Sequence, residues 1–185
     1  MSIKLHSLWL AQDDPKKNTA VISSKRGDIT LHKRISTLPK SGIILEPLCG
    51  KVFGPEDHTI LTQKKGSLVG LDCSWKHIEI SVDRVMRQTR LQPRMLPLLL
   101  AANPVNWGKP SKLTTIEALA TATYLAGNKS QAKSLLSRFS WGNRFIELNY
   151  EPLEAYSNAS SSKELVDLQF EFFDIEHLRG ANDES

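Results

Sequence analysis

Residues 94–120 read RMLPLLLAANPVNWGKPSKLTTIEALA, and this stretch decides the fold that we expect for the chain. It begins with an apolar run, residues 95–102, which only Pro97 interrupts. A run of this length that ends in turn residues is typical of a fully buried strand in an α/β sheet. The polar and turn-forming residues 103–110 predict a long loop after that strand.

A helix is expected directly after the loop. Thr114 and Glu117 stand three residues apart, with the hydroxyl first, which is the spacing of a capping box at a helix start. The loop therefore joins the carboxyl end of a strand to the N-terminus of a helix, where ligands of open α/β sheets bind. From the residues alone, an ordinary ordered connection explains the loop equally well.

The composition predicts one domain, or two small lobes that share a core. The chain has 185 residues, and 40% of them are hydrophobic, which is enough for a core. Its two cysteines provide neither a disulfide framework nor a metal quartet. We identify no signal peptide and no apolar run of the roughly 18 residues that a membrane span needs, so we expect a soluble cytoplasmic protein that does not contact membranes.

Positive charge is concentrated in the first 150 residues. They contain 22 Lys and Arg and 11 Asp and Glu, a net +11, whereas residues 151–185 contain 2 and 9, a net −7. A basic body with an acidic tail predicts contact with a polyanion such as RNA, and a solvated basic surface is the alternative. The arginines from position 84 onward recur at helical spacing, up to Arg94. The side chains that we expect to bind RNA are Lys16, Lys17, Lys25, Arg26, Arg84, Arg87 and Arg90.

The other elements follow from apolar patterns, caps and turn residues. We expect strands over residues 3–10, 42–45 and 67–71, with residues 51–54 as a hairpin partner, and helices over residues 19–24, 55–63, 75–87, 115–125 and 130–139 and after Ser161. Asp72 follows the strand 67–71 and precedes Trp75 by three residues, an arrangement typical of a site. Capping of the next helix by Asp72 is an alternative that does not exclude ligand binding.

Several signatures of other enzyme classes are absent from the sequence. It contains no GxGxxG, no Walker loop and no Cys/His cluster at metal-ligand spacing. The five histidines are scattered, and we expect them to be structural. A metal-free transferase that uses an activated donor would need none of these features.

Five groups of residues, in this order, resemble the family of small-subunit ribosomal RNA aminocarboxypropyltransferases. They are Asp13 to Thr19, Asp72 to Trp75, the run Leu96 to Pro110 (family pattern LPxLxAANPVNYGxP), Phe139 to Gly142, and Leu148 with Asn149. The resemblance spans roughly residues 4–157. The chain departs from the family pattern at a few positions. At Trp107 the family has Tyr, and at Ser111 it often has a larger aromatic residue. At Asn18 it usually has Cys or a similar small residue, and at Ala20 it has Gly.

The resemblance implies an α/β fold of the SPOUT-like class, a knotted sheet flanked by helices, with a smaller N-terminal α/β lobe. Residues 1–66 would be that basic lobe, which grips RNA, and residues 67–178 the cofactor-binding domain. Residues 179–185 would be a disordered acidic tail. The protein is expected to act as a monomer.

The resemblance also implies an activity. S-adenosyl-L-methionine would donate its 3-amino-3-carboxypropyl group to N3 of a modified uridine, such as pseudouridine, in the rRNA of the pre-ribosomal small subunit, without a metal. The residues expected to bind this donor are Thr19, Leu71, Asp72, Trp75, Leu96, Ser111, Thr114 and Thr115.

Asp72 is also the expected catalytic residue. It either holds the ammonium group of the donor or accepts the N3 proton. A SPOUT-class RNA methyltransferase and a non-catalytic RNA-binding factor of ribosome assembly are the alternative functions.

Overall fold

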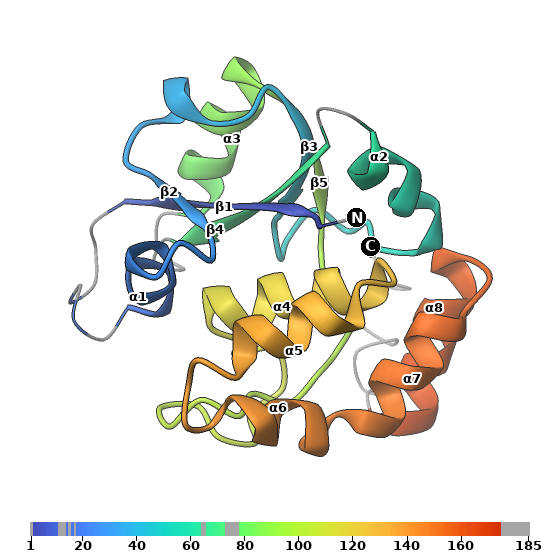
Figure 1. Cartoon of the computed structure of the whole chain (residues 1–185). Coiled ribbons are helices and arrows are strands. Elements are labelled where there is room, and N and C mark those ends of the chain that lie inside the picture. Colours follow the sequence, from blue (N-terminus) through green and yellow to red (C-terminus); the bar gives the residue numbers. More distant parts are fainter. Residues whose placement is uncertain are drawn as a thin grey trace.

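The computed structural model describes residues 2–10, 14, 16, 18–63, 66–72 and 78–174, with only the backbone for residues 78–81. Its elements form three layers around a central sheet (Figure 1). Helix α3 (Ile78–Gln88) covers one face, and α1 (Thr19–Lys25) and α4 (Thr115–Leu125) cover the other. The expected α/β class is therefore confirmed.

The sheet has five strands in the order β2-β1-β4-β3-β5. They are β1 (Lys4–Trp9), β2 (Thr30–His32), β3 (Ser41–Leu45), β4 (Ser67–Asp72) and β5 (Arg90–Arg94). All four pairings are parallel, so the carboxyl ends of the strands meet at one edge. Strands from before and after residue 66 thus belong to one sheet. That residues 1–66 bind RNA and residues 67–178 bind the cofactor stays a prediction.

Both faces of the sheet are buried, which explains the continuous apolar runs of its strands. On β3, Ile43 belongs to the core under α1 and α4, whereas its neighbour Ile44 packs on the side of α3. Gly70 on β4 allows close contact with α4, because a Cβ there would lie only 2.8 Å from Cγ2 of Thr115.

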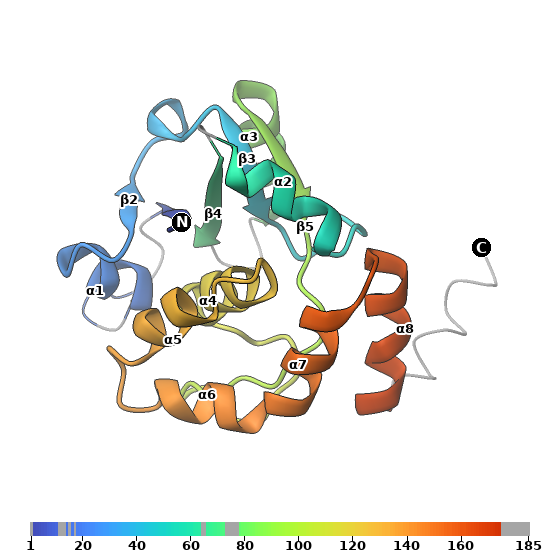
Figure 2. The ribbon, with the colours of Figure 1, turned by 45° about the vertical axis from the view of Figure 1, so that its right-hand side comes forward.

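The remaining helices are short, and two of them pack against α4. They are the 3-10 turns η1 (Ile35–Thr37) and η2 (Pro55–Asp57), and the helices α2 (His58–Thr62), α5 (Lys129–Leu136), α6 (Gly142–Leu148), α7 (Tyr150–Asn158) and α8 (Ser162–Phe172). In Figures 1 and 2, α6 and α7 lie beyond α4 and α5 as seen from the sheet. None of the helices in the described residues is long and apolar enough to cross a membrane.

The predicted helix starts are confirmed at three caps. The Asn18 side chain accepts a hydrogen bond from the backbone of α1 at 2.9 Å. Thr114 caps α4 and forms the expected capping box with Glu117. Ser161 caps α8, where its hydroxyl accepts from Glu164 N at 3.2 Å.

The prediction that residues 95–102 form a strand of the sheet is wrong. Strand β5 ends at Arg94, and the run beyond it makes only isolated bridges, at Met95 and Leu100. Pro97 has no N–H to donate to a neighbouring strand. The run leaves the sheet and passes between α4 and the α6–α7 junction (Figures 1 and 2). Leu99, Ala101 and Ala102 are fully buried there, so the apolar character of the run reflects packing among helices.

Helix side chains replace strand partners along this run. Leu98 N donates to Gln169 Oε1 at 2.8 Å, and Leu98 O accepts from the hydroxyl of Tyr156 at 3.2 Å. Asn149 binds both backbone groups of Leu100, at 2.7 and 2.9 Å. These contacts satisfy the backbone of a buried segment that belongs to no sheet.

Three smaller expectations also differ from the structure. Residues 51–54 are no hairpin partner, because Val52 forms a parallel bridge with Met95. The short strand β2 carried too little pattern to be predicted. The arginine spacing does not follow one helix, since α3 ends at Gln88 and both Arg90 and Arg94 lie on β5.

Candidate active site

A pocket of about 300 Å³ lies at the carboxyl edge of the sheet. Its walls come from the ends of β3 and β4, the segment after β5, and the N-terminal turn of α4. The lining residues are Leu45, Glu46, Pro47, Leu48, Gly70, Leu71, Met95, Leu96, Pro97, Ser111, Leu113, Thr114, Thr115 and Ala118. The pocket is mostly apolar with a few polar groups, as is typical of small-molecule sites, and its volume is at the lower end of their range.

Five residues that we predicted to bind a cofactor line this pocket: Leu71, Leu96, Ser111, Thr114 and Thr115. They come from three separate segments of the chain, so the fold brings together what the sequence holds apart. Thr19 and Asp72 do not line the pocket, although Asp72 directly follows Leu71 at the same edge. Trp75 lies outside the described residues, and so does Lys17.

Asp72 is tied to the start of α1. Its Oδ2 accepts a hydrogen bond from Asn18 Nδ2 at 2.6 Å, while Asn18 Oδ1 caps the helix. Because side chains alternate along a strand, Asp72 points to the same side of β4 as Gly70, toward the layer of α1 and α4. The carboxylate is thus held next to the pocket in a defined orientation.

Glu46 is a second carboxylate at this edge, and it was missed from the sequence. It follows β3 directly, lines the pocket and is only 5% exposed. Its Oε1 accepts from Leu48 N at 2.7 Å. The signal that pointed to Asp72, a carboxylate directly after a buried strand, also applies to Glu46 and could have found it.

Glu117 fixes the loop after the apolar run to the N-terminus of α4. Its carboxylate is fully buried and accepts five hydrogen bonds. Oε1 accepts from the backbone N–H groups of Ala102 at 2.7 Å and Asn103 at 3.0 Å. Oε2 accepts from Asn103 Nδ2 at 2.9 Å and from the backbone N–H and hydroxyl of Thr114 at 2.7 and 2.9 Å. The capping box predicted from the sequence therefore also anchors the loop.

The loop folds back as a hairpin that delivers Ser111 to the pocket. Gly108 N donates to Ala101 O at 2.7 Å, and Ser111 N donates to Leu99 O at 3.0 Å. Ser111 has φ of 57°, the only positive value among the described non-glycine residues. Such a conformation costs free energy and is common where a backbone is shaped for function.

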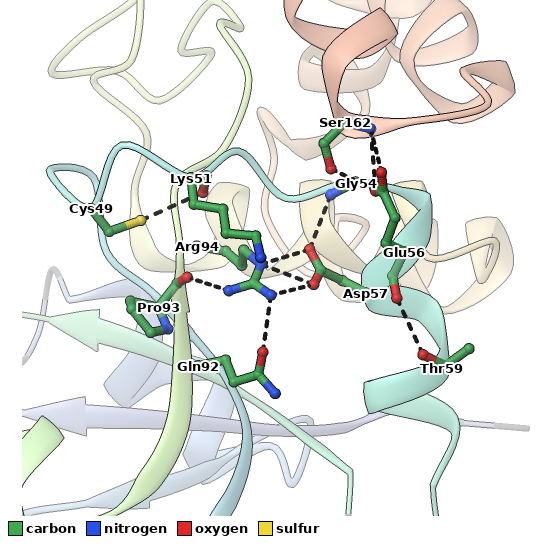
Figure 3. Close-up of polar contacts among 10 residues, drawn as sticks. All are labelled: Cys49, Lys51, Gly54, Glu56, Asp57, Thr59, Gln92, Pro93, Arg94 and Ser162. Carbon is green, nitrogen blue, oxygen red and sulfur yellow. Dashed lines mark hydrogen bonds and ion pairs between the residues drawn. The ribbon is translucent and has the colours of Figure 1, made fainter.

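Arg94 has a different role from the one that its spacing suggested. It is 4% exposed, and its guanidinium binds the carboxylate of Asp57, which is 2% exposed (Figure 3). Arg94 precedes Met95, Leu96 and Pro97 of the pocket wall. The ion pair therefore fixes the position at which the chain leaves β5.

The predicted RNA-binding side chains that the structure describes, Lys16, Lys25, Arg26, Arg84, Arg87 and Arg90, are all exposed. Arg26 donates to Arg138 O at 2.6 Å and lies over the ring of Phe139. Arg90 begins β5 and hence lies at the amino edge of the sheet, opposite the pocket. The basic side chains therefore occupy several sides of the molecule.

His6 and His32 pair with each other, away from the pocket. Within the residues that the structure describes, no three His, Cys, Asp or Glu side chains are grouped to hold a metal ion. His6 Nδ1 lies 3.0 Å from His32 Nε2, and neither residue lines the pocket. Burial, with contributions from His32 and Lys4, lowers the pKa of His6 from 6.5 to about 4.

Comparisons with known proteins identify relatives along most of the chain. The family model described as "Ribosome biogenesis protein, C-terminal" matches residues 43–173. A protein of Methanosarcina mazei named 16S rRNA aminocarboxypropyltransferase is 44% identical over 167 residues, which cover 90% of this chain and 93% of that protein. A protein of the same name from Methanocaldococcus jannaschii is 40% identical over 169 residues, or 91% and 95% of the two chains.

A solved structure is similar in fold as well as in sequence. It is the SAM-dependent rRNA:acp-transferase Tsr3 from Vulcanisaeta distributa, with a TM-score of 0.81 and 36% identity. The match covers 96% of this chain and 92% of that chain.

Proposed function

The chain belongs to the family of 16S rRNA aminocarboxypropyltransferases, and from this membership we propose that it transfers the 3-amino-3-carboxypropyl group of S-adenosylmethionine to small-subunit rRNA during ribosome biogenesis. The observation that carries the proposal is the pocket at the carboxyl edge of the sheet. Five of its lining residues are those to which the family resemblance assigns donor binding.

The pocket is chemically suited to this donor. An adenosine needs apolar walls and backbone groups, which Leu71 and Leu96 supply, and its amino acid arm needs charged partners. Thr114 and Thr115 stand at the N-terminus of α4, whose partial positive charge favours a carboxylate such as that of the arm. The N–H and hydroxyl of Thr114 already donate to Glu117, so we assign the carboxylate of the arm to Thr115. Ser111 adds a third hydroxyl to the lining.

We assign the two carboxylates at this edge to different parts of the donor. Glu46 follows β3, next to β4, and an acidic residue after a neighbouring strand binds ribose hydroxyls in many α/β sites. Asp72, oriented by Asn18, binds the ammonium group of the arm. Thr19, which directly follows Asn18 at the start of α1, is proposed as a further contact of the arm.

The sulfonium of the donor supplies an electrophilic carbon, so the protein has mainly to position and desolvate the reactants. We propose N3 of a modified uridine, such as pseudouridine, as the nucleophile. A bond forms between N3 and the carboxypropyl carbon, the carbon–sulfur bond breaks with its electron pair on sulfur, and methylthioadenosine leaves. The N3 proton departs as the bond forms, to water or to Asp72. Trp75, outside the described residues, is proposed as part of the wall around the donor.

The resemblance supports further proposals. The protein acts as a cytoplasmic monomer, its chain is knotted in the SPOUT manner, and residues 1–66 contribute most of the grip on RNA. The burial of residues 95–102 between α4 and the α6–α7 junction supports a chain that passes through its own fold. The exposed side chains of Lys16, Lys25 and Arg26 support the role of the N-terminal part.

Labelled donor tests the reaction. Small-subunit RNA that lacks the modification is incubated with the protein and with donor labelled either in the methyl group or in the carboxyl carbon. We expect carboxyl label in RNA and methyl label in released methylthioadenosine. Methyl label in RNA would identify a methyltransferase, and RNA binding without transfer of either label would identify an assembly factor.

Two variants separate the roles of the carboxylates. Glu46→Gln should weaken binding of both the donor and methylthioadenosine by about tenfold or more, because a hydrogen bond to a charged group contributes about 1.5–3 kcal/mol. Asp72→Asn should weaken binding of the donor but not of methylthioadenosine, since methylthioadenosine has no ammonium arm. The exposed Glu151→Gln is the matched control. Equal effects of Glu46→Gln and Asp72→Asn on both ligands would refute the assignment.

A further inference from the structure

We propose that Trp107 is a stacking platform for an unpaired base of the substrate RNA, close to the nucleotide that enters the pocket; the proposal rests on the proposed function. Trp107 is 56% exposed, and Val105 in the same loop is 82% exposed. An exposed indole ring offers a π-face to any base, and proteins that bind single-stranded nucleic acid use aromatic rings in this way.

The ring is presented on a rigid support. Asn103, at the start of the turn, is 3% exposed and held by Glu117, and its Oδ1 accepts from Asn106 N at 3.0 Å. On the other side of Trp107, Gly108 N donates to Ala101 O at 2.7 Å with φ of 72°. Because the backbone on both sides is fixed, stacking on the ring costs little additional ordering of the protein.

The platform lies near the pocket. Trp107 precedes Ser111 by four residues, so their Cα atoms are at most about 14 Å apart. Ser111 lines the pocket. A base of the loop that carries the acceptor can therefore reach the ring while the acceptor is in the pocket.

The charge around Trp107 favours RNA over a protein as the binding partner of the ring. Lys109 and Lys112 flank the ring on the chain, and both are exposed. Residues 103–113 contain no Asp or Glu. An exposed aromatic ring between cationic side chains combines the two interactions that single-stranded nucleic acid requires, stacking and phosphate neutralisation.

The test compares substitutions that differ in aromatic character. Affinity for a small-subunit rRNA hairpin and the rate of carboxypropyl transfer are measured for the wild type, Trp107→Ala, Trp107→Leu and Trp107→Phe. We expect Trp107→Ala and Trp107→Leu to weaken RNA binding by about 5- to 150-fold, the range for removal of one base–aromatic stack. Trp107→Phe should retain most of the affinity, because a phenyl ring still stacks.

Abasic RNA identifies the contact. Hairpins that lack one base each, at positions around the acceptor, are bound to wild-type protein and to Trp107→Ala. At one position, removal of the base should strongly weaken RNA binding by the wild type, whereas RNA binding by Trp107→Ala should hardly change. Val105→Ala is the control in the same loop and should change affinity less than twofold. Donor affinity, from calorimetry, and the melting temperature should stay the same in all variants.

The outcomes separate this proposal from the proposed function. If the wild type transfers the label and Trp107→Ala binds RNA equally well, the platform is refuted and the function stands. If Trp107→Ala is normal on isolated RNA but slow on pre-ribosomal particles, the ring contacts a protein there, which also refutes the platform. If the wild type transfers no label, the proposed function fails, whatever Trp107 does in binding.

Discussion

The guanidinium of Arg94 and the carboxylate of Asp57 form a buried, multiply bonded ion pair between the end of β5 and the turn before α2 (Figure 3). Arg94 Nε lies 2.9 Å from both carboxylate oxygens, and Nη2 lies 2.8 Å from Oδ1. Nη1 also donates to Pro93 O at 2.7 Å, and Nη2 to Gln92 Oε1 at 3.0 Å. Both charges are thus compensated, which burial requires.

We expect Arg94→Gln to lower the free energy of unfolding by about 3–5 kcal/mol, because it leaves the Asp57 carboxylate buried without its partner. Urea unfolding measures the decrease. Arg90→Gln, at an exposed position on the same strand, is the control and should stay within about 0.5 kcal/mol of the wild type. Similar stabilities of the two variants would show that the pair is dispensable for folding.

Glu117→Gln should loosen the loop that carries Ser111 and Trp107. A carboxamide has only one acceptor oxygen, so it cannot replace a carboxylate that accepts five hydrogen bonds. We expect faster hydrogen exchange at the amides of Ala102 and Asn103, together with weaker donor binding. Glu164→Gln, at an exposed carboxylate that accepts from Ser160 N before α8, is the control and should leave these two amides unchanged. Unaltered exchange in Glu117→Gln would contradict the anchoring role.

The free energy of unfolding should decrease as the pH falls from about 6.5 to about 4, because of His6. Its pKa in the folded protein is about 4, below its ordinary 6.5, because of burial first and the neighbouring His32 second. The unfolded chain therefore binds a proton below pH 6.5 that the folded protein accepts only near pH 4. The contribution of neutral His6 is complete above pH 6.5 and is lost as the pH falls toward 4.

The measurement is the melting temperature of the wild type and of His6→Gln between pH 7.5 and pH 4. His6→Gln should lose less stability over this range than the wild type. The exposed His58→Gln should follow the wild-type curve. Parallel curves for the wild type and His6→Gln would exclude His6 as the source of the pH dependence.

RNA affinity should depend on salt through the exposed basic side chains. Removal of one side chain that binds a phosphate should reduce the slope of log affinity against log salt by about 0.7–0.9. We expect a smaller slope for a Lys16→Ala, Lys25→Ala, Arg26→Ala variant, whereas Lys163→Ala, in the acidic part of the chain, should keep the wild-type slope. A separate Arg90→Ala variant tests whether RNA reaches the amino edge of the sheet. Identical slopes for the wild type and all of these variants would show that Lys16, Lys25, Arg26 and Arg90 do not bind RNA.

Local signals in the sequence were sufficient for most elements. Thr114 and Ser161 marked helix starts because caps are contacts between residues three positions apart or fewer. The strands β1, β3 and β4 could be predicted from the sequence because a parallel sheet that is buried on both faces requires apolar runs. The resemblance to a family added the positions of five pocket residues, which no local pattern contains.

The sequence by itself determined that the chain alternates strands and helices, as an α/β fold does, and where several helices start, since each of these depends on near neighbours in the chain. Only the tertiary structure decided how residues 95–102 and Arg94 are used. An apolar run is equally suited to a strand and to an extended segment among helices, and the choice depended on Asn149 and Gln169, about 50 and 70 residues away. An arginine is equally suited to an RNA surface and to a buried ion pair, and the choice depended on Asp57, 37 residues earlier, because a distant carboxylate makes its burial possible.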